Sequence, residues 1–313
     1  MNEKIIDPVA LDLIEAELTA ERFLRKTNKG GNEIYIVDAH NAPNVMREIG
    51  RLREIAFRTA GGGTGKDCDI DEFDTMTPPC RQLIVWDPES RQILGGYRYI
   101  TGSDIRVDGE GRPRIATSHM FDFSPRFITE FLPQTIELGR SFVRLEYQSS
   151  KMGAKAIYAL DNLWDGLGAL TVVHPEIRYL FGKVTMYPSY SAECRNMILY
   201  FLAKHFPDPD HLVVPRQPLD SHMDVAALKE VFTGATFKDD YKILNKAIRD
   251  HGYNIPPLVN AYMSLSPTMR MFGTAINDEF GDVEESGIFF AISEIFEEKK
   301  QRHIGTYHQW ETR

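Results

Sequence analysis

The sequence has few cysteines, and none is placed for a disulfide framework or a metal site. Only three of its 313 residues are cysteines, Cys68, Cys80 and Cys194. No two of them have the spacing of a zinc site, and an odd number leaves no closed set of disulfides. We therefore expect a reduced, cytoplasmic protein that binds no metal.

Long apolar runs are also absent. No stretch approaches the ~18 consecutive apolar residues of a membrane-spanning helix. The N-terminus, MNEKIIDPVALDLIEAEL, lacks the basic start and apolar stretch of a secretory signal. Any action on lipids would therefore take place from the membrane surface.

An excess of positive charge is missing as well. The chain has 36 Lys and Arg against 45 Asp and Glu, which gives a formal net charge of -9. A general nucleic-acid binder would carry a basic face. We therefore expect no nucleic-acid partner.

Several catalytic motifs are absent too. Gly61 to Asp67, GGGTGKD, resembles a phosphate-binding loop. However, Ala60 occupies the position of its first glycine, and Asp67 that of the hydroxyl residue that binds magnesium. The chain contains no HExxH and no GxSxG, which argues against a zinc protease and a serine hydrolase.

The composition that remains is that of a globular domain, with 42% hydrophobic and 26% charged residues. Apolar periodicity and turn residues predict a mixed sheet flanked by helices, an α/β or α+β domain. The expected strands cover residues 33–37, 82–87, 92–101, 134–143, 179–186, 258–265 and 287–295. The expected helices cover residues 11–23, 43–59, 153–167, 191–204 and 221–251, and Asn41 or Asn44 is expected to cap the second of these.

Three short patterns of charged and aromatic residues are distributed along these elements. Each alone is compatible with an ordinary charged surface. They are Arg53-x-x-x-Phe57 followed by Asp69-x-Asp71-x-x-Asp74, then Gly95-Gly96-Tyr97-Arg98, and finally Glu137-Leu138-Gly139-Arg140.

Taken together and in this order, the patterns resemble those of the acyl-homoserine-lactone synthases. They resemble more closely those of the ornithine-lipid and glycine-lipid N-acyltransferases, a hemolysin-like branch of the GNAT superfamily. A closing segment, Pro256-Pro257-Leu258, Tyr262 and Asp278-x-Phe280-Gly281, continues the resemblance. It covers roughly residues 33–295.

The resemblance implies a GNAT fold, in which a central strand splays from its neighbour and the thioester arm of the donor lies in the gap. The strand from Glu137 to Val143 would be the splayed one. Backbone N–H groups near Phe142 and Val143 would face the thioester carbonyl, and each donor of such an oxyanion site is worth roughly 3 kcal/mol. Residues 1–32 would be a helical extension, 33–298 the acyltransferase domain with a helical insertion at 221–255, and 299–313 a polar tail.

The donor implied by the resemblance is an acyl thioester, and no further cofactor is expected. Coenzyme A users hold the pyrophosphate with a Q/R-x-x-G-x-G/A loop at a helix start. Here the corresponding stretch, Gln148 to Ala154, has its glycine displaced to Gly153. This favours acyl carrier protein over coenzyme A as the donor's carrier. An acidic carrier protein needs basic contacts, for which the candidates are Arg144, Lys151, Lys155 and Lys183, or these lysines serve only solubility.

The amine must lose a proton before it attacks, and Glu137 is the first candidate for the base. The alternative is a structural ion pair of Glu137 with Arg98 or Arg140. The remaining charged residues would bind the carboxylate and ammonium of an amino acid, or pin the acidic loop, and both roles are compatible. They are Arg53, Asp69, Asp71, Asp74, Arg98 and Arg140.

The aromatic residues have a simpler expected role. Phe57, Phe73 and Trp86 are expected to line the core or an acyl tunnel. Tyr187 or Tyr190 is a candidate for protonating the leaving thiolate.

The resemblance implies an N-acyltransferase that moves a long acyl chain, often 3-hydroxylated in the family, from acyl carrier protein to glycine or ornithine for aminolipid synthesis. A peripheral contact with the inner membrane is compatible with such a product. One alternative is a coenzyme A-dependent acetyltransferase of small acyl groups. The other is a GNAT-like binding module without activity.

Overall fold

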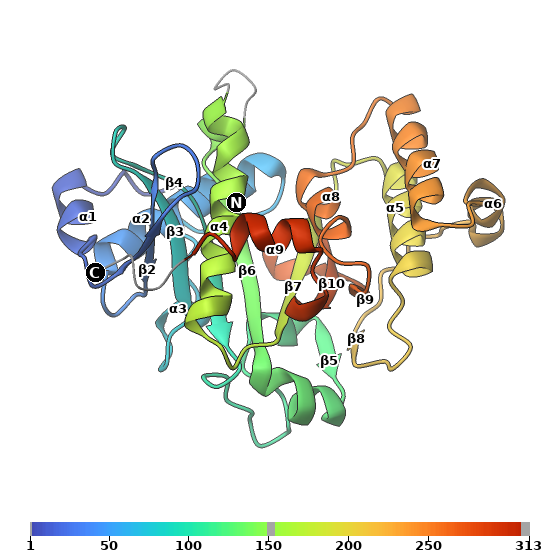
Figure 1. Cartoon of the computed structure of the whole chain (residues 1–313), viewed down its shortest axis with the longest axis horizontal. Coiled ribbons are helices and arrows are strands. Elements are labelled where there is room, and N and C mark those ends of the chain that lie inside the picture. The colour runs from blue at the N-terminus through green and yellow to red at the C-terminus, as the bar shows by residue number, and fades with distance from the viewer. Residues whose placement is uncertain (1, 149–153, 308–313) are drawn as a thin grey trace.

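The computed structural model describes residues 2–148 and 154–307, and its centre is a twisted eight-stranded sheet (Figure 1). The strand order is β1-β2-β3-β4-β6-β7-β10-β9. Every neighbouring pair is antiparallel except β6 and β7, which are parallel. The strands are β1 (Phe23–Lys26), β2 (Glu33–Val37), β3 (Arg81–Asp87), β4 (Gln92–Thr101), β6 (Thr135–Val143), β7 (Tyr179–Met186), β9 (Arg270–Asn277) and β10 (Val283–Ala291).

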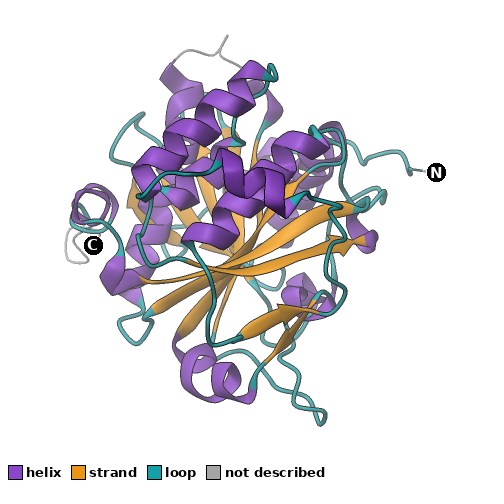
Figure 2. Cartoon of the chain, turned by 90° about the vertical axis from the view of Figure 1, so that its right-hand side faces the viewer, coloured by secondary structure: helices purple, strands orange, loops and turns teal. Residues whose placement is uncertain are grey.

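Helices cover both faces of this sheet, and the sequence of β3 shows why. Leu83 and Val85 join the cluster that contains the residues of α4, whereas Ile84 and Trp86 join the cluster that contains those of α2. A strand buried on both faces reads as a continuous apolar run rather than an alternating one. The α-helices are α1 (Leu11–Glu17), α2 (Pro43–Ala60), α3 (Glu72–Thr75), α4 (Ala154–Val173), α5 (Ala192–His205), α6 (Val225–Val231), α7 (Phe237–Asp250), α8 (Pro257–Met263) and α9 (Glu297–His303). Figure 2 shows helices packed over the fan of strands.

A third cluster, rich in phenylalanine, lies at the β7–β10–β9 end of the sheet. Phe127 contacts Phe181, Phe272 and Phe289 with ring centroids 5.6–6.2 Å apart. A small two-stranded sheet of β5 (Phe121–Phe123) and β8 (Val213–Pro215) contributes to it. Short helical turns complete the chain: η1 (Ala116–His119), η2 (Phe127–Phe131), η3 (Leu132–Gln134), η4 (Leu145–Gln148), η6 (Asp278–Phe280) and η7 (Ile292–Glu294).

The predicted mixed sheet with a splayed strand pair is confirmed, but three local expectations were wrong. Residues 258–265, expected as a strand, form helix α8, which begins at Pro257. Strands β1 and β9 were not expected. Neither Asn41 nor Asn44 caps α2: the Glu17 carboxylate accepts hydrogen bonds from the N–H groups of Asn44 and Val45, at 3.1 and 2.8 Å.

Segments within residues 2–32, 221–255 and 299–307 pack against the rest of the domain. Strand β1 is an edge strand of the central sheet. Helix α9 packs against α4, where His303 Nδ1 lies 2.8 Å from the buried Asp165 carboxylate. Within 221–255, Leu244 and Ile248 of α7 are completely buried in the main core. Among the described residues, no helix is both long and apolar enough to traverse a bilayer.

The contact between α4 and α9 yields a test of the fold. A Cβ on Gly168 would lie 2.2 Å from the carbonyl oxygen of His303. We expect Gly168→Ala to lower the free energy of unfolding by about 1–3 kcal/mol through overpacking, despite the better helix propensity of alanine. Urea unfolding measures this, with Gly109→Ala as the control because a Cβ there meets nothing within 4 Å. Equal midpoints for the two variants would contradict the close packing of α9.

Candidate active site

The central feature of the site is a fork between the parallel strands β6 and β7. Their register runs from Thr135↔Tyr179 to Leu138↔Gly182 and ends there. On its other side β6 stays paired with β4 as far as Val143, across a bulge opposite Gly96–Arg98. Arg140, inside the bulge, has a positive φ of 48°. Bulges bend a strand and increase its twist, so this one turns β6 away from β7.

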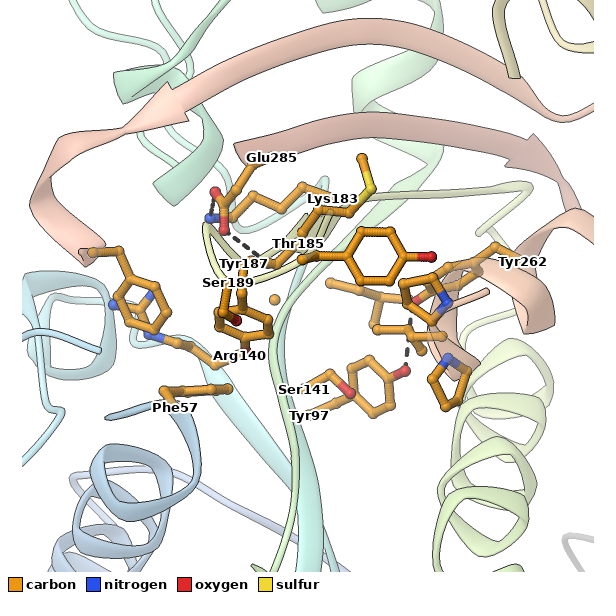
Figure 3. Close-up of a pocket in the computed structure, with 18 of the residues that line it drawn as sticks. Phe57, Tyr97, Arg140, Ser141, Lys183, Thr185, Tyr187, Ser189, Tyr262 and Glu285 are labelled. Atoms are coloured by element: carbon orange, nitrogen blue, oxygen red, sulfur yellow. Dashed lines mark hydrogen bonds and ion pairs between the residues drawn. The ribbon is translucent and has the colours of Figure 1, made fainter. Parts of the chain in front are cut away.

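A cavity of about 530 Å³ opens at the fork (Figure 3). One side is formed by Leu138–Ser141 of β6, and the facing side by residues of β7 and the loop that follows it. Its remaining surface is mostly aromatic and apolar. Besides β6, it is lined by Phe57, Tyr97, Lys183, Thr185, Met186, Tyr187, Ser189, Tyr190, Tyr253, Asn254, Pro256, Pro257, Leu258, Tyr262, Phe280 and Glu285.

A second cavity, of about 500 Å³, adjoins the first and is more polar. The two cavities share Arg140, Lys183 and Phe280. The second is otherwise lined by Thr64, Lys66, Asp71, Glu72, Phe73, Ala116, His119, Met120, Asn277 and Glu279. An apolar chain and a small charged molecule could therefore meet at the three shared residues.

The six charged residues predicted to cluster form one connected network. The Arg98 guanidinium bridges Asp71 at 2.6 Å and Asp74 at 3.3 Å. Arg53 contacts Asp74 at 3.4 Å, and both side chains are fully buried. Arg140 Nε contacts Asp69 at 2.9 Å, and its Nη2 contacts Asp71 at 3.5 Å.

This network holds the acidic loop against the sheet. Asp71 caps α3, and its side chain accepts from the N–H groups of Phe73 and Asp74. Burial raises the pKa of the Asp71 carboxyl, but Arg98, Arg140 and Arg53 outweigh burial and hold that pKa well below its ordinary range. Asp71 is therefore charged at neutral pH. Arg140 Nη1 has no hydrogen-bond partner among the described residues and remains available to a ligand.

Glu137 is buried and lines neither cavity. Its Oε1 accepts from the N–H and the hydroxyl of Thr117, at 3.2 and 2.9 Å. Among the described residues, Glu137 forms no ion pair with Arg98 or Arg140, which was the structural role considered as the alternative. Burial raises the pKa of Glu137 more than Arg98 and Thr117 lower it.

The backbone groups predicted to bind the thioester oxygen lie at the end of β6. The N–H of Arg144 donates to Leu94 of β4 at 2.8 Å. Because peptide directions alternate along a strand, the N–H of Phe142 also points to β4, and only that of Val143 points to the β7 side. Neither residue lines the cavities.

Of the basic residues predicted to contact a carrier protein, the structure describes the side chains of Arg144 and Lys183, and these two do not form an exposed patch. Arg144 pairs with Glu146 at 3.1 Å, and Gln148 Nε2 donates to the Val143 carbonyl at 2.6 Å. Lys183 was wrongly placed at the surface: its side chain is only 8% exposed and forms an ion pair with Glu285. Lys151, Gly153 and the side chain of Lys155 lie outside the described residues.

The predicted aromatic residues fall into two groups. Phe57 lines the first cavity and packs edge-on against Phe280, and Phe73 lines the second, whereas Trp86 is in the core. Tyr187 and Tyr190 both line the first cavity, where burial raises the pKa of each hydroxyl to about 12. Both are therefore protonated donors at neutral pH.

Sequence reasoning missed two polar groups in the first cavity. One is the Lys183–Glu285 pair, for which a lysine inside the apolar run of β7 was a signal. The other is the pair of phenols Tyr97 and Tyr262, whose oxygens lie 3.3 Å apart. Their sequence separation of 165 residues hides this contact.

Within residues 2–148 and 154–307, no group of three or more His, Cys, Asp or Glu side chains has an arrangement suited to a metal ion. The site instead offers an apolar cavity with arginine and lysine, and the N–H of Val143 lies two residues beyond its lining on β6. This arrangement fits the attack of an amine on an acyl thioester. It can stabilise negative charge on the thioester oxygen, bind the carboxylate of the acceptor, and hold an apolar acyl chain.

Comparison with known proteins places the chain among acyltransferases. Residues 52–157 match the acetyltransferase (GNAT) domain family. A glycine N(alpha)-acyltransferase of Bacteroides thetaiotaomicron is 66% identical over 305 residues, 97% of this chain and 90% of that protein. A glycine N(alpha)-acyltransferase of Phocaeicola vulgatus is 60% identical over 97% of this chain and 94% of that protein.

Two solved structures are similar at low sequence identity. The AHL synthase LasI has 10% identity and a TM-score of 0.41, over 88% of this chain and 96% of its own. FeeM, an N-acyl amino acid synthase from uncultured soil microbes, has 11% identity and a TM-score of 0.41, over 85% of this chain and 94% of its own.

The charged network yields a stability test. Asp74→Ala leaves Arg53 without its carboxylate partner and deprives Arg98 of one of two. Removing one partner of a buried ion pair lowers the free energy of unfolding by about 3–5 kcal/mol. Denaturant unfolding would detect this loss. Glu130→Gln removes an ion pair with Arg126 whose two side chains are more than half exposed, and should leave the midpoint unchanged. Similar midpoints for both variants would show that the network contributes little to stability.

Proposed function

The chain belongs to the family of the glycine N(alpha)-acyltransferases, and from this premise we propose that it transfers a long acyl chain from acyl carrier protein to the amino group of glycine. The fork between β6 and β7 carries this proposal, because it joins an apolar cavity to a polar one at Arg140 and Lys183. The first cavity would take the thioester and its acyl chain. The second would take the amino acid.

Arg140 is the residue best placed to bind the carboxylate of glycine. It borders both cavities, Phe280 covers one face of its guanidinium at 4.4 Å, and its Nη1 is available. Asp69 and Asp71 hold its other nitrogens, so that the side chain has little freedom to lose on binding.

The N–H of Val143, two residues beyond the last β6 residue that lines the first cavity, is the group proposed to bind the thioester oxygen. It points to the β7 side of β6, where no strand pairs with it. Gln148 already satisfies the Val143 carbonyl, which leaves the N–H as the group that the fork exposes. A hydrogen bond from it would stabilise negative charge on the thioester oxygen as the amine attacks.

The phenols Tyr97 and Tyr262, together with the hydroxyl of Ser141, support a donor whose acyl chain carries a 3-hydroxyl group. They form a polar group in a cavity that is otherwise mostly apolar, and burial raises the pKa of both phenols, so both stay uncharged. A buried hydroxyl without a hydrogen-bond partner is destabilising. These hydroxyls would therefore favour an acyl chain whose 3-hydroxyl group bonds to them. A product of this kind, an acylated amino acid, would enter aminolipid synthesis.

The displaced glycine after Gln148 supports acyl carrier protein rather than coenzyme A. A decisive experiment incubates the purified protein with glycine or ornithine and four donors: 3-hydroxyacyl and unsubstituted acyl groups of equal length, each on acyl carrier protein and on coenzyme A. Mass spectrometry should detect N-(3-hydroxyacyl)glycine from the carrier-protein donor at the highest rate. Acylation of ornithine alone, or product formation from the coenzyme A donors alone, would contradict the proposal.

A variant of Arg140 tests the acceptor site. We expect Arg140→Gln to lower kcat/KM for glycine by about 10- to 150-fold, the cost of losing a hydrogen bond to a charged group of roughly 1.5–3 kcal/mol. The rate with methylamine, which has no carboxylate, should fall much less. An equal loss with both amines would mean that Arg140 acts only by holding the acidic loop.

A further inference from the structure

Among the described residues, Lys183 is the only one that lines both cavities and can accept a proton in its neutral form. Three residues line both cavities, Arg140, Lys183 and Phe280. A guanidinium does not release its proton in proteins, and a phenyl ring has none to exchange. We propose that Lys183 is the proton acceptor of the reaction, taking a proton from the ammonium group of the amino acid at the junction of the two cavities. This assignment rests on the function proposed above.

The backbone places Lys183 at the origin of the fork. The last pair in the β6–β7 register is Leu138↔Gly182, so Lys183 is the first residue of β7 beyond it. Its side chain points into the cavity toward Glu285 of β10 (Figure 3). The thioester arm and the amine would both have to pass this point to meet.

Glu285 holds the lysine in place. Its carboxylate is 2% exposed and also accepts from Thr185 at 3.0 Å and from Asn277 at 3.1 Å. Both carboxylate oxygens are thus engaged by fixed partners. Glu285 is a positioning residue, and the lysine nitrogen is the group left to exchange protons with a substrate.

Burial favours the neutral form of the Lys183 amine. Burial is the main cause that lowers the pKa of Lys183, and Arg140 on β6 and Arg98 on β4 lower it further, against the opposing effect of Glu285. Glu137 on β6 is the other carboxylate close enough to interact. Buried lysines with lowered pKa values are suited to act as general bases.

The proposed step balances as follows. Uncharged Lys183 takes one proton from the ammonium group, and the freed nitrogen lone pair attacks the thioester carbon. The new C–N bond forms, the C–S bond breaks, and its electron pair stays on sulfur. The second nitrogen proton neutralises the thiolate, directly or through the Tyr187 hydroxyl, and Lys183 then releases its proton to water. The products are an amide, a thiol and one proton.

The other candidates are less well placed. Glu137 lines neither cavity and is bonded to Thr117. His119 lines only the second cavity, where it packs against Phe73. Tyr187 and Tyr190 have pKa values of about 12 and serve as donors rather than acceptors.

A change of acceptor separates proton transfer from structural effects. Glycine enters as an ammonium and needs a base, whereas the aminooxy group of aminooxyacetate is uncharged at neutral pH and needs none before attack. Lys183→Arg retains a cationic partner for Glu285 but cannot accept a proton. We expect it to lower kcat/KM for glycine by about 100- to 10,000-fold, and that for aminooxyacetate by less than about 10-fold.

Two further variants complete this experiment. Lys246→Met removes an exposed lysine of α7 that lines neither cavity, and should leave the ratio of the two acceptor rates unchanged. Glu285→Gln removes the carboxylate that raises the pKa of Lys183. The activity with glycine requires neutral Lys183 and therefore rises with pH. In Glu285→Gln, the midpoint of this rise should lie about 1 pH unit or more below that of the wild-type protein.

Equal losses with glycine and aminooxyacetate in Lys183→Arg would overturn the assignment. An unshifted pH profile in Glu285→Gln would overturn it too, and this second variant remains informative if Lys183→Arg does not fold. Wild-type protein that acylates both acceptors while Lys183→Arg loses both alike would refute the role of Lys183 and leave the proposed function intact. Wild-type protein that acylates neither would overturn both.

Discussion

Strands β6 and β7 stop pairing at Leu138 and Gly182, and the candidate active site depends on this separation. A parallel pair normally continues its hydrogen bonds to the end of the shorter strand. Here the bulge opposite Gly96–Arg98 and the positive φ of Arg140 turn β6 aside. The backbone groups released in this way become a site for a substrate, and the space between the strands becomes a cavity.

The fork must be rigid on both sides to be useful. On the β6 side, the salt-bridge network ties three arginines from α2, β4 and β6 to the carboxylates of the acidic loop. Charges this deeply buried are tolerated because each has partners of opposite sign. On the β7 side, eight residue pairs between β7 and β10 provide the support, and the Lys183–Glu285 pair lies on that ladder. Sheet pairing and buried ion pairs therefore stabilise both halves of the cavity, with the larger charge network on the β6 side.

Local sequence patterns explain which elements and residues could be predicted and which could not. Strands β3, β4 and β7 could be predicted because apolar or β-branched runs end at clear turns, and the arginine and aspartate patterns predicted the network because their order matched a known family. Residues 258–265 could not be assigned correctly, since a short apolar run fits a strand as well as a buried helix. Pro257 at the first turn decides for the helix. Strand β1 was too short to show a periodicity, and β9 has glycine in its middle.

The sequence by itself determined the fold class, the acyltransferase family and the composition of the charged cluster, because these follow from local patterns and their order. Only the tertiary structure decided that Glu137 bonds to Thr117 and lines neither cavity, that Lys183 is buried, and that Glu285, about a hundred residues away, is the partner of Lys183. The physical reason is that burial and charge pairing belong to neighbours in space. Strand β10 reaches β7 only after the chain has passed through four helices, and no local pattern in β7 records which residue will lie beside it.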